Sequence, residues 1–207
     1  MTDAFALLGL ERRPWLEPED IKRRFLELSA PWHPDRHHGA SEAAMADVLQ
    51  RYSSLNAAHQ LLAEPRERLL HLIELECGSK PRDIQRIPPG TMDLFVEVGH
   101  ACRECDAFLQ QRGTSTSPML RLKSMQEGLE WSEKLEDIAT RVRAMESALT
   151  AELRDLGKAW ADAPPQGDPG RLASLPMERL EQIYRTLSYV SRWLGQVRER
   201  VVQLATG

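Results

Sequence analysis

The chain has few of the residues that mark several protein classes. It contains only three cysteines in 207 residues, which excludes a disulfide-rich scaffold and is typical of a reducing compartment. No apolar run approaches the roughly 18 residues of a membrane span, so we expect no transmembrane helix. Positive charge is not in excess, since the formal net charge is −4, and this argues against a general nucleic-acid-binding protein.

Several enzyme signatures are also missing. The sequence has no glycine-rich phosphate-binding loop, no arrangement of nucleophile and base, and no complete set of metal ligands. Strand-like alternation of apolar and polar residues does not occur either. The composition, with 42% hydrophobic and 28% charged residues, is that of an ordinary soluble protein with a folded core. We therefore expect an all-α protein.

The most informative stretch is the turn Trp32-His33-Pro34-Asp35-Arg36-His37-His38, which lies between two amphipathic segments. Pro34 lacks an N–H and disfavours helical backbone at His33, so the preceding helix must end there. Before the turn, an apolar stripe at helical spacing is separate from a basic face. The stripe is Ile21, Phe25, Leu28 and Trp32, and the basic face is Lys22, Arg23 and Arg24.

Two other interpretations of this turn remain open. A turn rich in His and Asp between helices can be a solvated connector with no further role. Imidazole and carboxylate groups can also bind zinc or iron, and the candidate ligands are His33, Asp35, His37 and His38. The metal interpretation is weaker, because Pro34 restricts the geometry and no second ligand pair at helical spacing lies nearby.

The residues from Ile21 to Arg36 resemble the second helix and the His-Pro-Asp (HPD) loop of J-domains. Residues 5–10 resemble the opening segment of that family, and residues 54–65 resemble the end of its third helix. An HPD tripeptide alone is weak evidence for a J-domain, but here the segments on both sides also match the family at the expected spacing. The J-like pattern begins within a few residues of Met1, so we expect no signal or transit peptide and a cytoplasmic protein.

Local signals place the helices of this first domain. Asp3 can cap a short helix that Gly9 ends, Pro18 suits the first turn of the next helix, and Ser41 can cap the third. A fourth helix covers residues 66–76, with Gly78 as its C-cap. We predict a J-domain over residues 1–77 and a proline-stiffened linker over 78–90.

The remainder, residues 91–207, is predicted to be a three-helix bundle. Apolar residues recur at three- and four-residue spacing over 94–109, 131–160 and 180–204, and such seams specify helix-on-helix packing. Cys102 and Cys105 are three apart on the first seam, which favours core packing over a metal or redox role. Tyr189 and Trp193 lie beside the last seam, where they either widen the buried face or anchor a partner.

Taken over the whole chain, the order of J-domain, linker and bundle resembles the HscB co-chaperones of iron–sulfur cluster biogenesis. The resemblance implies a protein that is not an enzyme and has no cofactor. By this resemblance it would dock on a DnaK-type (HscA-like) chaperone and stimulate its ATPase. Asp35 would pair with an arginine of the ATPase, His33 and Pro34 would shape the loop, and Lys22, Arg23 and Arg36 would steer the encounter.

The resemblance also implies that the bundle holds the iron–sulfur scaffold protein as client. Leu94, Phe95, Val98 and Tyr189 match the client-binding patch of the family, and Trp193 is a further candidate beside Tyr189. Leu26 and Glu27 lower the positive charge of the docking face, and residues 99–102 replace an acidic stretch of the family. The alternatives are a J-domain co-chaperone with another client, a metal-dependent enzyme using the His-rich turn, or a Cys/His metal-binding protein.

Overall fold

The computed structural model of the protein describes residues 2–81, 90–112 and 118–206. All regular secondary structure in these ranges is helical, which confirms the predicted all-α class with an N-terminal J-domain and a C-terminal helical bundle. None of the helices in the described ranges combines the length and apolar character needed to cross a membrane. The chain forms two compact units, Met1–Asp83 with Ala151–Tyr184, and Ile84–Thr150 with Arg185–Gly207.

The first helix, α1 (Ala4–Leu8), has the caps that its sequence predicts. One carboxylate oxygen of Asp3 accepts the backbone N–H groups of Phe5 and Ala6, at 2.9 and 3.1 Å. Gly9 ends the helix in the left-handed region with φ 62°. A Cβ at this position would push the flexible end of the Arg24 side chain aside, but it is the left-handed backbone that favours glycine here.

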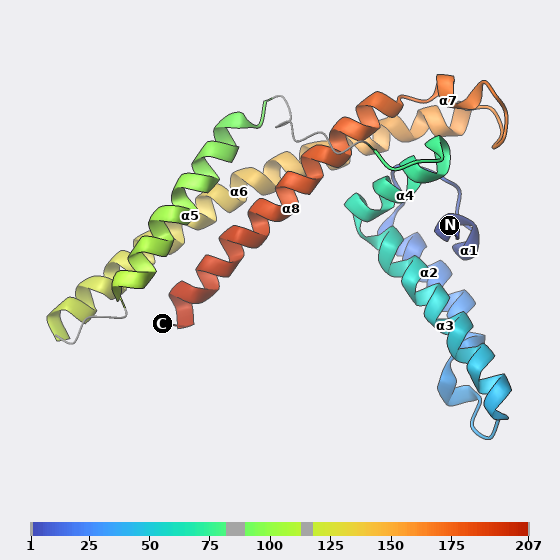
Figure 1. The fold of residues 1–207 in the computed structure, drawn as a ribbon, viewed down its shortest axis with the longest axis horizontal. Coiled ribbons are helices and arrows are strands. Elements are labelled where there is room, and N and C mark those ends of the chain that lie inside the picture. The colour runs from blue at the N-terminus through green and yellow to red at the C-terminus, as the bar shows by residue number, and fades with distance from the viewer. Residues whose placement is uncertain (1, 82–89, 113–117, 207) are drawn as a thin grey trace. The chain divides into compact units, whose positions relative to one another are not determined.

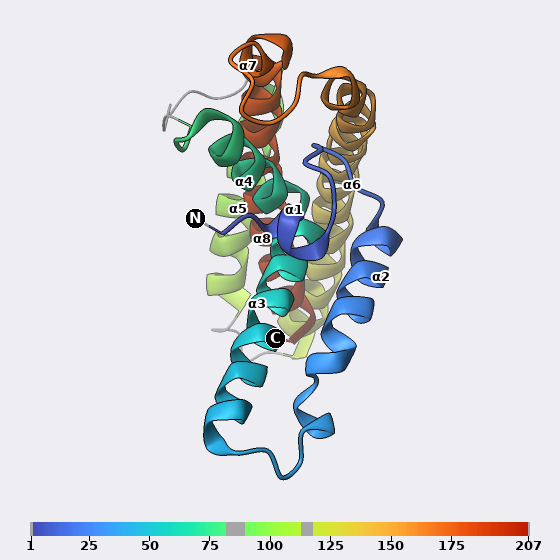
Figure 2. The same ribbon diagram turned by 90° about the vertical axis from the view of Figure 1, so that its right-hand side faces the viewer.

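Helices α2 (Pro18–Ser29) and α3 (Glu42–Ala63) form a hairpin, and α4 (Pro65–Cys77) follows. Figures 1 and 2 show α2 and α3 side by side, with the connecting turn at one end of the pair. Pro18 occupies the first turn of α2, Ser41 caps α3 through Ala44 N–H, and Gly78 ends α4 with φ 71°. These features agree with the local signals in the sequence.

The first unit also contains the end of α6 (Pro118–Asp162), the short helix α7 (Arg171–Ser174) and the start of α8 (Met177–Thr206). A buried ion pair joins these segments to α4, because Arg171 donates to the Glu76 carboxylate at 2.8 and 2.9 Å. The Trp15 ring lies between the guanidinium groups of Arg68 and Arg154, at 5.5 and 4.7 Å.

These contacts could not be predicted from the sequence, since Arg171 follows a connector rich in proline and glycine. The predicted division into residues 1–77, 78–90 and 91–207 follows chain order, whereas the first unit combines segments that are distant in the chain. The boundary at residues 78–90 therefore stays a prediction, and residues 82–89 of the predicted linker lie outside the described residues.

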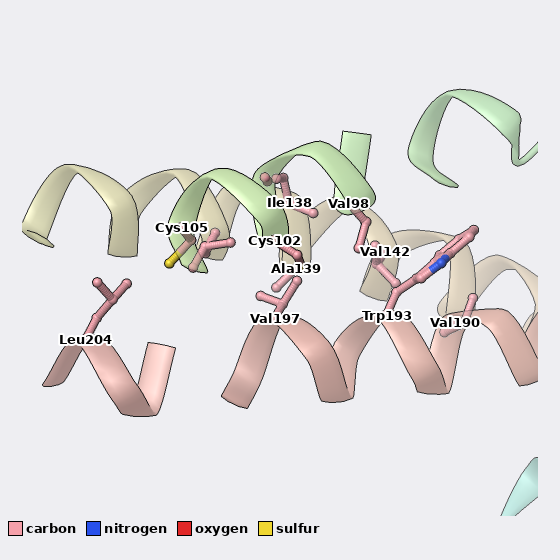
Figure 3. Close-up of a cluster of buried hydrophobic side chains, with 12 residues drawn as sticks. Val98, Cys102, Cys105, Ile138, Ala139, Val142, Val190, Trp193, Val197 and Leu204 are labelled. Atoms are coloured by element: carbon pink, nitrogen blue, oxygen red, sulfur yellow. The ribbon is translucent and has the colours of Figure 1, made fainter. Parts of the chain in front are cut away.

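In the second unit, α5 (Met92–Arg112) packs with α6 and α8 around one apolar core. Figure 3 shows side chains from all three helices meeting there. The buried members are Val98, Ala101, Cys102, Cys105, Leu135, Ile138, Ala139, Val142, Val190, Trp193, Val197 and Leu204. Ion pairs add specificity at the edges: Glu97 of α5 pairs with Arg141 of α6, and Asp106 of α5 pairs with Arg200 of α8.

Candidate functional site

The HPD turn lies at the end of the α2–α3 hairpin. After α2 ends, Ala30–Trp32 and Pro34–Arg36 form two short 3₁₀ turns, and His33 between them is extended, with φ −66° and ψ 127°. This is the backbone conformation that Pro34 imposes on its predecessor. The Asp35 N–H donates to Nδ1 of His33 at 3.3 Å, and the Asp35 side chain remains 79% exposed. The carboxylate is thus presented to solvent.

Residues of α3 hold this turn from the side. The ring of Tyr52 meets the His33 ring edge-on, with centroids 5.4 Å apart. The guanidinium of Arg51 lies 4.2 Å from the centre of the Trp32 ring. The sequence predicted neither the contact of Tyr52 with His33 nor any role for Arg51. Both contacts depend on how the hairpin closes.

The predicted steering cations differ in how far they are neutralised. Arg23 is paired with Asp20 at 2.7 Å and with Glu27 at 3.4 Å, and the hydrogen bond that it donates to Asp20 raises the pKa of its guanidinium. Lys22 and Arg36 are exposed and form no ion pair with any described residue. These two cations therefore carry most of the unbalanced positive charge of the docking face.

The neighbouring His37 has structural partners. Nε2 of His37 lies 2.8 Å from the carbonyl oxygen of Pro31, and its ring stacks near Trp32 with centroids 6.5 Å apart. Within the described ranges, no three His, Cys, Asp or Glu side chains are arranged to hold a metal ion. The geometry thus offers no support for the metal interpretation of the turn.

The predicted client-binding residues of the second unit divide into exposed and buried ones. Phe95 is 40% exposed, and Met92 and Val96 beside it are exposed as well. Leu94 and Tyr189 are partly buried and pack against the core, whereas Val98 is a core residue. The first turns of α5 therefore present an apolar surface, and Val98 supports that surface from below.

The structure corrects the prediction that Trp193 binds the client. It is 3% exposed and belongs to the core of the second unit, so it cannot anchor a partner on the surface. A strict three–four spacing drifts by about 20° per heptad around a straight helix, and this drift turns Trp193 inward while Leu194 is only partly buried. The alternative that the aromatic pair widens the buried face describes Trp193 correctly.

Cys102 and Cys105 pack in the same core. Burial raises the pKa of both thiols, which lowers the fraction of the reactive thiolate. The third cysteine, Cys77, lies in the other compact unit, and burial raises the pKa of its thiol as well. The preference for core packing at Cys102 and Cys105 agrees with the structure.

The chain is similar to known proteins both in sequence and in fold. No protein-family model matches the chain. It is 30% identical over 74 residues to the co-chaperone protein HscB of Proteus mirabilis, a region covering 36% of this chain and 43% of that protein. The aligned region thus spans less than half the length of that relative.

The folds agree over a much longer stretch. The chaperone HscB from Vibrio cholerae superimposes with a TM-score of 0.63 and 20% identity, over 98% of this chain and 99% of that one. Human co-chaperone protein HscB gives a TM-score of 0.61 and 18% identity, over 96% and 81% of the two chains. The chain has the HscB fold. The resemblance expected from the sequence is therefore confirmed.

Proposed function

We propose that this protein is a J-domain co-chaperone of iron–sulfur cluster assembly. It stimulates ATP hydrolysis by a DnaK-type, HscA-like chaperone and delivers a client, the iron–sulfur scaffold protein, bound on its helical bundle. In this role the protein acts on the ATPase of its partner and carries no catalytic site or cofactor of its own. A cytoplasmic location fits this function.

The observation that carries the proposal is the HPD turn itself. Its carboxylate, Asp35, is exposed at the end of a rigid hairpin, and its backbone is fixed by Pro34 and the Asp35 N–H to His33 hydrogen bond. A charge held in one geometry on a rigid scaffold loses little conformational entropy on binding. Asp35 is thus suited to pair with a cation, an arginine in our proposal, on the partner ATPase.

Lys22 and Arg36 would act earlier, during the approach of the two proteins. Unpaired exposed cations next to the turn attract an acidic face at long range, and such charges change the association rate more than the lifetime of a complex. Arg23 contributes less, since Asp20 and Glu27 already neutralise it. The Lys22→Ala variant should therefore slow association more than Arg23→Ala, and this difference should shrink at high salt.

Single-turnover ATP hydrolysis tests the main claim. The host's DnaK-type chaperones are measured with the wild-type protein and with Asp35→Asn, which removes one charge and keeps the shape. We expect stimulation of one chaperone and its near-complete loss in the variant, because losing a buried charge partner typically costs about 2–5 kcal/mol. A wild-type protein that stimulates none of them, or a fully active variant, would refute the proposed role of the turn.

Client binding rests on the exposed start of α5. Phe95→Asp places a charge at the centre of this apolar surface while leaving the core intact, since Phe95 is exposed. We expect this variant to bind the scaffold protein at least about tenfold more weakly in titration calorimetry. Leu172→Asp is the matched control, because Leu172 is an exposed apolar residue of the other unit. Unchanged affinity in Phe95→Asp would point to another client or another surface.

A further inference from the structure

Helices α5 and α8 lie side by side and run in the same direction. Arg200 of α8 donates to the Cys102 carbonyl at 3.2 Å and to the Asp106 carboxylate at 2.7 Å. Farther toward the end of both helices, Arg112 of α5 donates to the Leu204 carbonyl at 2.9 Å. Because residue numbers rise together along this contact, earlier positions of α5 lie beside earlier positions of α8.

This register brings the exposed start of α5 next to Tyr189. Asp106 and Arg200 are paired across the two helices, and Phe95 and Tyr189 each precede one of them by eleven residues. Eleven residues are about three helical turns, which return each helix to nearly the same side. Phe95 and Tyr189 therefore lie at the same level, along the edge where α5 meets α8. The proposed client-binding surface thus includes part of α8.

Two arginines at this surface have no opposite charge. The guanidinium of Arg192 lies 5.8 Å from the centre of the Tyr189 ring. Arg103 lies eight residues after Phe95 on α5, and its guanidinium extends back over Gly99, where a Cβ would lie 3.5 Å from its Nη1. Both arginines are exposed, and neither forms an ion pair with any described residue. Positive charge is therefore available on both helices beside the apolar surface.

The carboxylates of α5 and of this part of α8 are paired or point elsewhere. Asp106 is bound in its ion pair with α8. Glu97 and Glu104 pair with cations of α6, on the other side of α5. Asp93 lies two positions before the exposed phenylalanine, about 200° away around the helix. On α8, Glu199 lies about two turns beyond the unpaired arginine and 4.0 Å from the arginine that binds Asp106.

We propose that the client segment bound at this surface carries an acidic side chain next to an apolar one, and that Arg103 and Arg192 select it. The inference rests on the proposed client-binding role of the start of α5. The apolar surface supplies affinity, whereas charges at its edge discriminate between partners. The Tyr189 ring holds one guanidinium in place, and a guanidinium can bind a carboxylate through two hydrogen bonds.

Titration calorimetry with the iron–sulfur scaffold protein measures this selection. Arg192→Glu and Arg103→Glu should each weaken binding about three- to tenfold, because each places a carboxylate opposite that of the client. High salt should reduce this effect but not that of Phe95→Ala, which removes an apolar contact. Arg192→Lys keeps the charge and should bind within about twofold of wild type. Arg198→Glu is the matched control, since Arg198 is an exposed arginine of α8 on the side toward α6.

Two labelled peptides test the same surface without the scaffold protein. They have equal length, and leucine alternates with glutamate in one and with lysine in the other. The whole chain has a net charge of −4, so long-range attraction favours the lysine peptide. We expect fluorescence anisotropy to show tighter binding of the glutamate peptide, and Arg103→Glu combined with Arg192→Glu to abolish this preference. Lys22→Ala removes a cation of the J-domain instead and should retain the preference.

The outcomes separate this inference from the proposed function. If Phe95→Ala weakens scaffold binding and neither arginine variant does, the surface binds its client without reading charge, and only the inference is wrong. If the wild-type chain binds no scaffold protein but prefers the glutamate peptide, the inference stands and the proposed client is wrong. A wild-type chain that prefers the lysine peptide, or neither peptide, overturns the inference whatever the scaffold protein does.

Discussion

His71 shows how a single residue sets the pH dependence of the J-domain. It is buried, its Nε2 accepts the Ala4 N–H at 3.0 Å, and its ring stacks on Phe5 at 5.8 Å. Burial lowers the pKa of this imidazole, although the nearby carboxylates of Asp3 and Glu74 partly oppose the shift. A protonated Nε2 could not accept the Ala4 N–H, so the folded state favours the neutral ring.

The consequence for stability has a definite sign. The unfolded chain binds a proton on His71 more readily than the folded chain, so folding stability falls as the pH drops below the ordinary histidine pKa of about 6.5. The loss continues until the pH passes below the lowered pKa of the folded state. The pKa of Asp3 is also lowered: burial raises it, but the Arg12 hydrogen bond and other contacts outweigh this. Its contribution is lost only at much more acidic pH.

Denaturant unfolding between about pH 7.5 and about pH 5.5 measures this effect. We expect His71→Gln, which keeps an acceptor but does not titrate, to lose less stability over this range than the wild-type protein. His38→Gln is the control, since His38 is exposed, and it should behave as wild type. Equal pH slopes for His71→Gln and the wild-type protein would show that His71 does not control the stability in this range.

At the level of elements, the α2–α3 hairpin determines where the HPD turn points. The turn has its own backbone restraints, but the contact of Tyr52 with His33 fixes it to α3. Phe25 of α2 also lies between Tyr52 and His59 of α3, with ring centroids 6.5 and 4.6 Å away. The sequence predicts both helices and the turn, whereas the orientation of the turn depends on this aromatic packing.

Removal of the Tyr52 ring should therefore weaken ATPase stimulation without touching the HPD residues. An edge-on ring contact is worth about 0.5–1.5 kcal/mol, so Tyr52→Ala should reduce stimulation severalfold. Tyr52→Phe retains the ring and should be close to wild type. Single-turnover hydrolysis compares the two, with circular dichroism confirming that the helices persist. If both variants retained full stimulation, the turn would be positioned without α3.

At the scale of the whole molecule, the ion pair of Arg171 and Glu76 joins segments that are 95 residues apart in the chain. Both side chains are nearly inaccessible to solvent, and Arg171 also donates to the Pro164 carbonyl at 2.6 Å. The hydrogen bond that Arg171 donates to Glu76 raises the pKa of the guanidinium. The pair ties the start of α7 to the end of α4 inside the first compact unit.

Breaking one side of this pair should be costly. Arg171→Met leaves the Glu76 carboxylate buried without its partner, and we expect a loss of about 3 kcal/mol in the free energy of unfolding. The double variant Arg171→Met with Glu76→Leu should recover much of that loss, because no buried charge remains. Denaturant unfolding of the three proteins gives the comparison. Additive losses in the double variant would mean that the pair is not coupled in solution.

Features that depend on neighbouring residues could be predicted from the sequence alone. Pro34 fixed the conformation of His33, Asp3 and Gly9 fixed the ends of α1, and the spacing of apolar residues fixed the long helices, because each signal acts within about one helical turn. The likeness to J-domains followed from the HPD turn and its flanks, and the likeness to HscB followed from the order of J-domain, linker and bundle along the chain.

Which side chains from distant segments meet could be seen only after the chain was folded. The burial of Trp193, the contact of Tyr52 with His33 and the ion pair of Arg171 with Glu76 all depend on how helices pack, and small angular drifts along a helix change which residue faces inward. Spacing along the chain cannot supply that information, since it defines the face of a helix but not what covers that face.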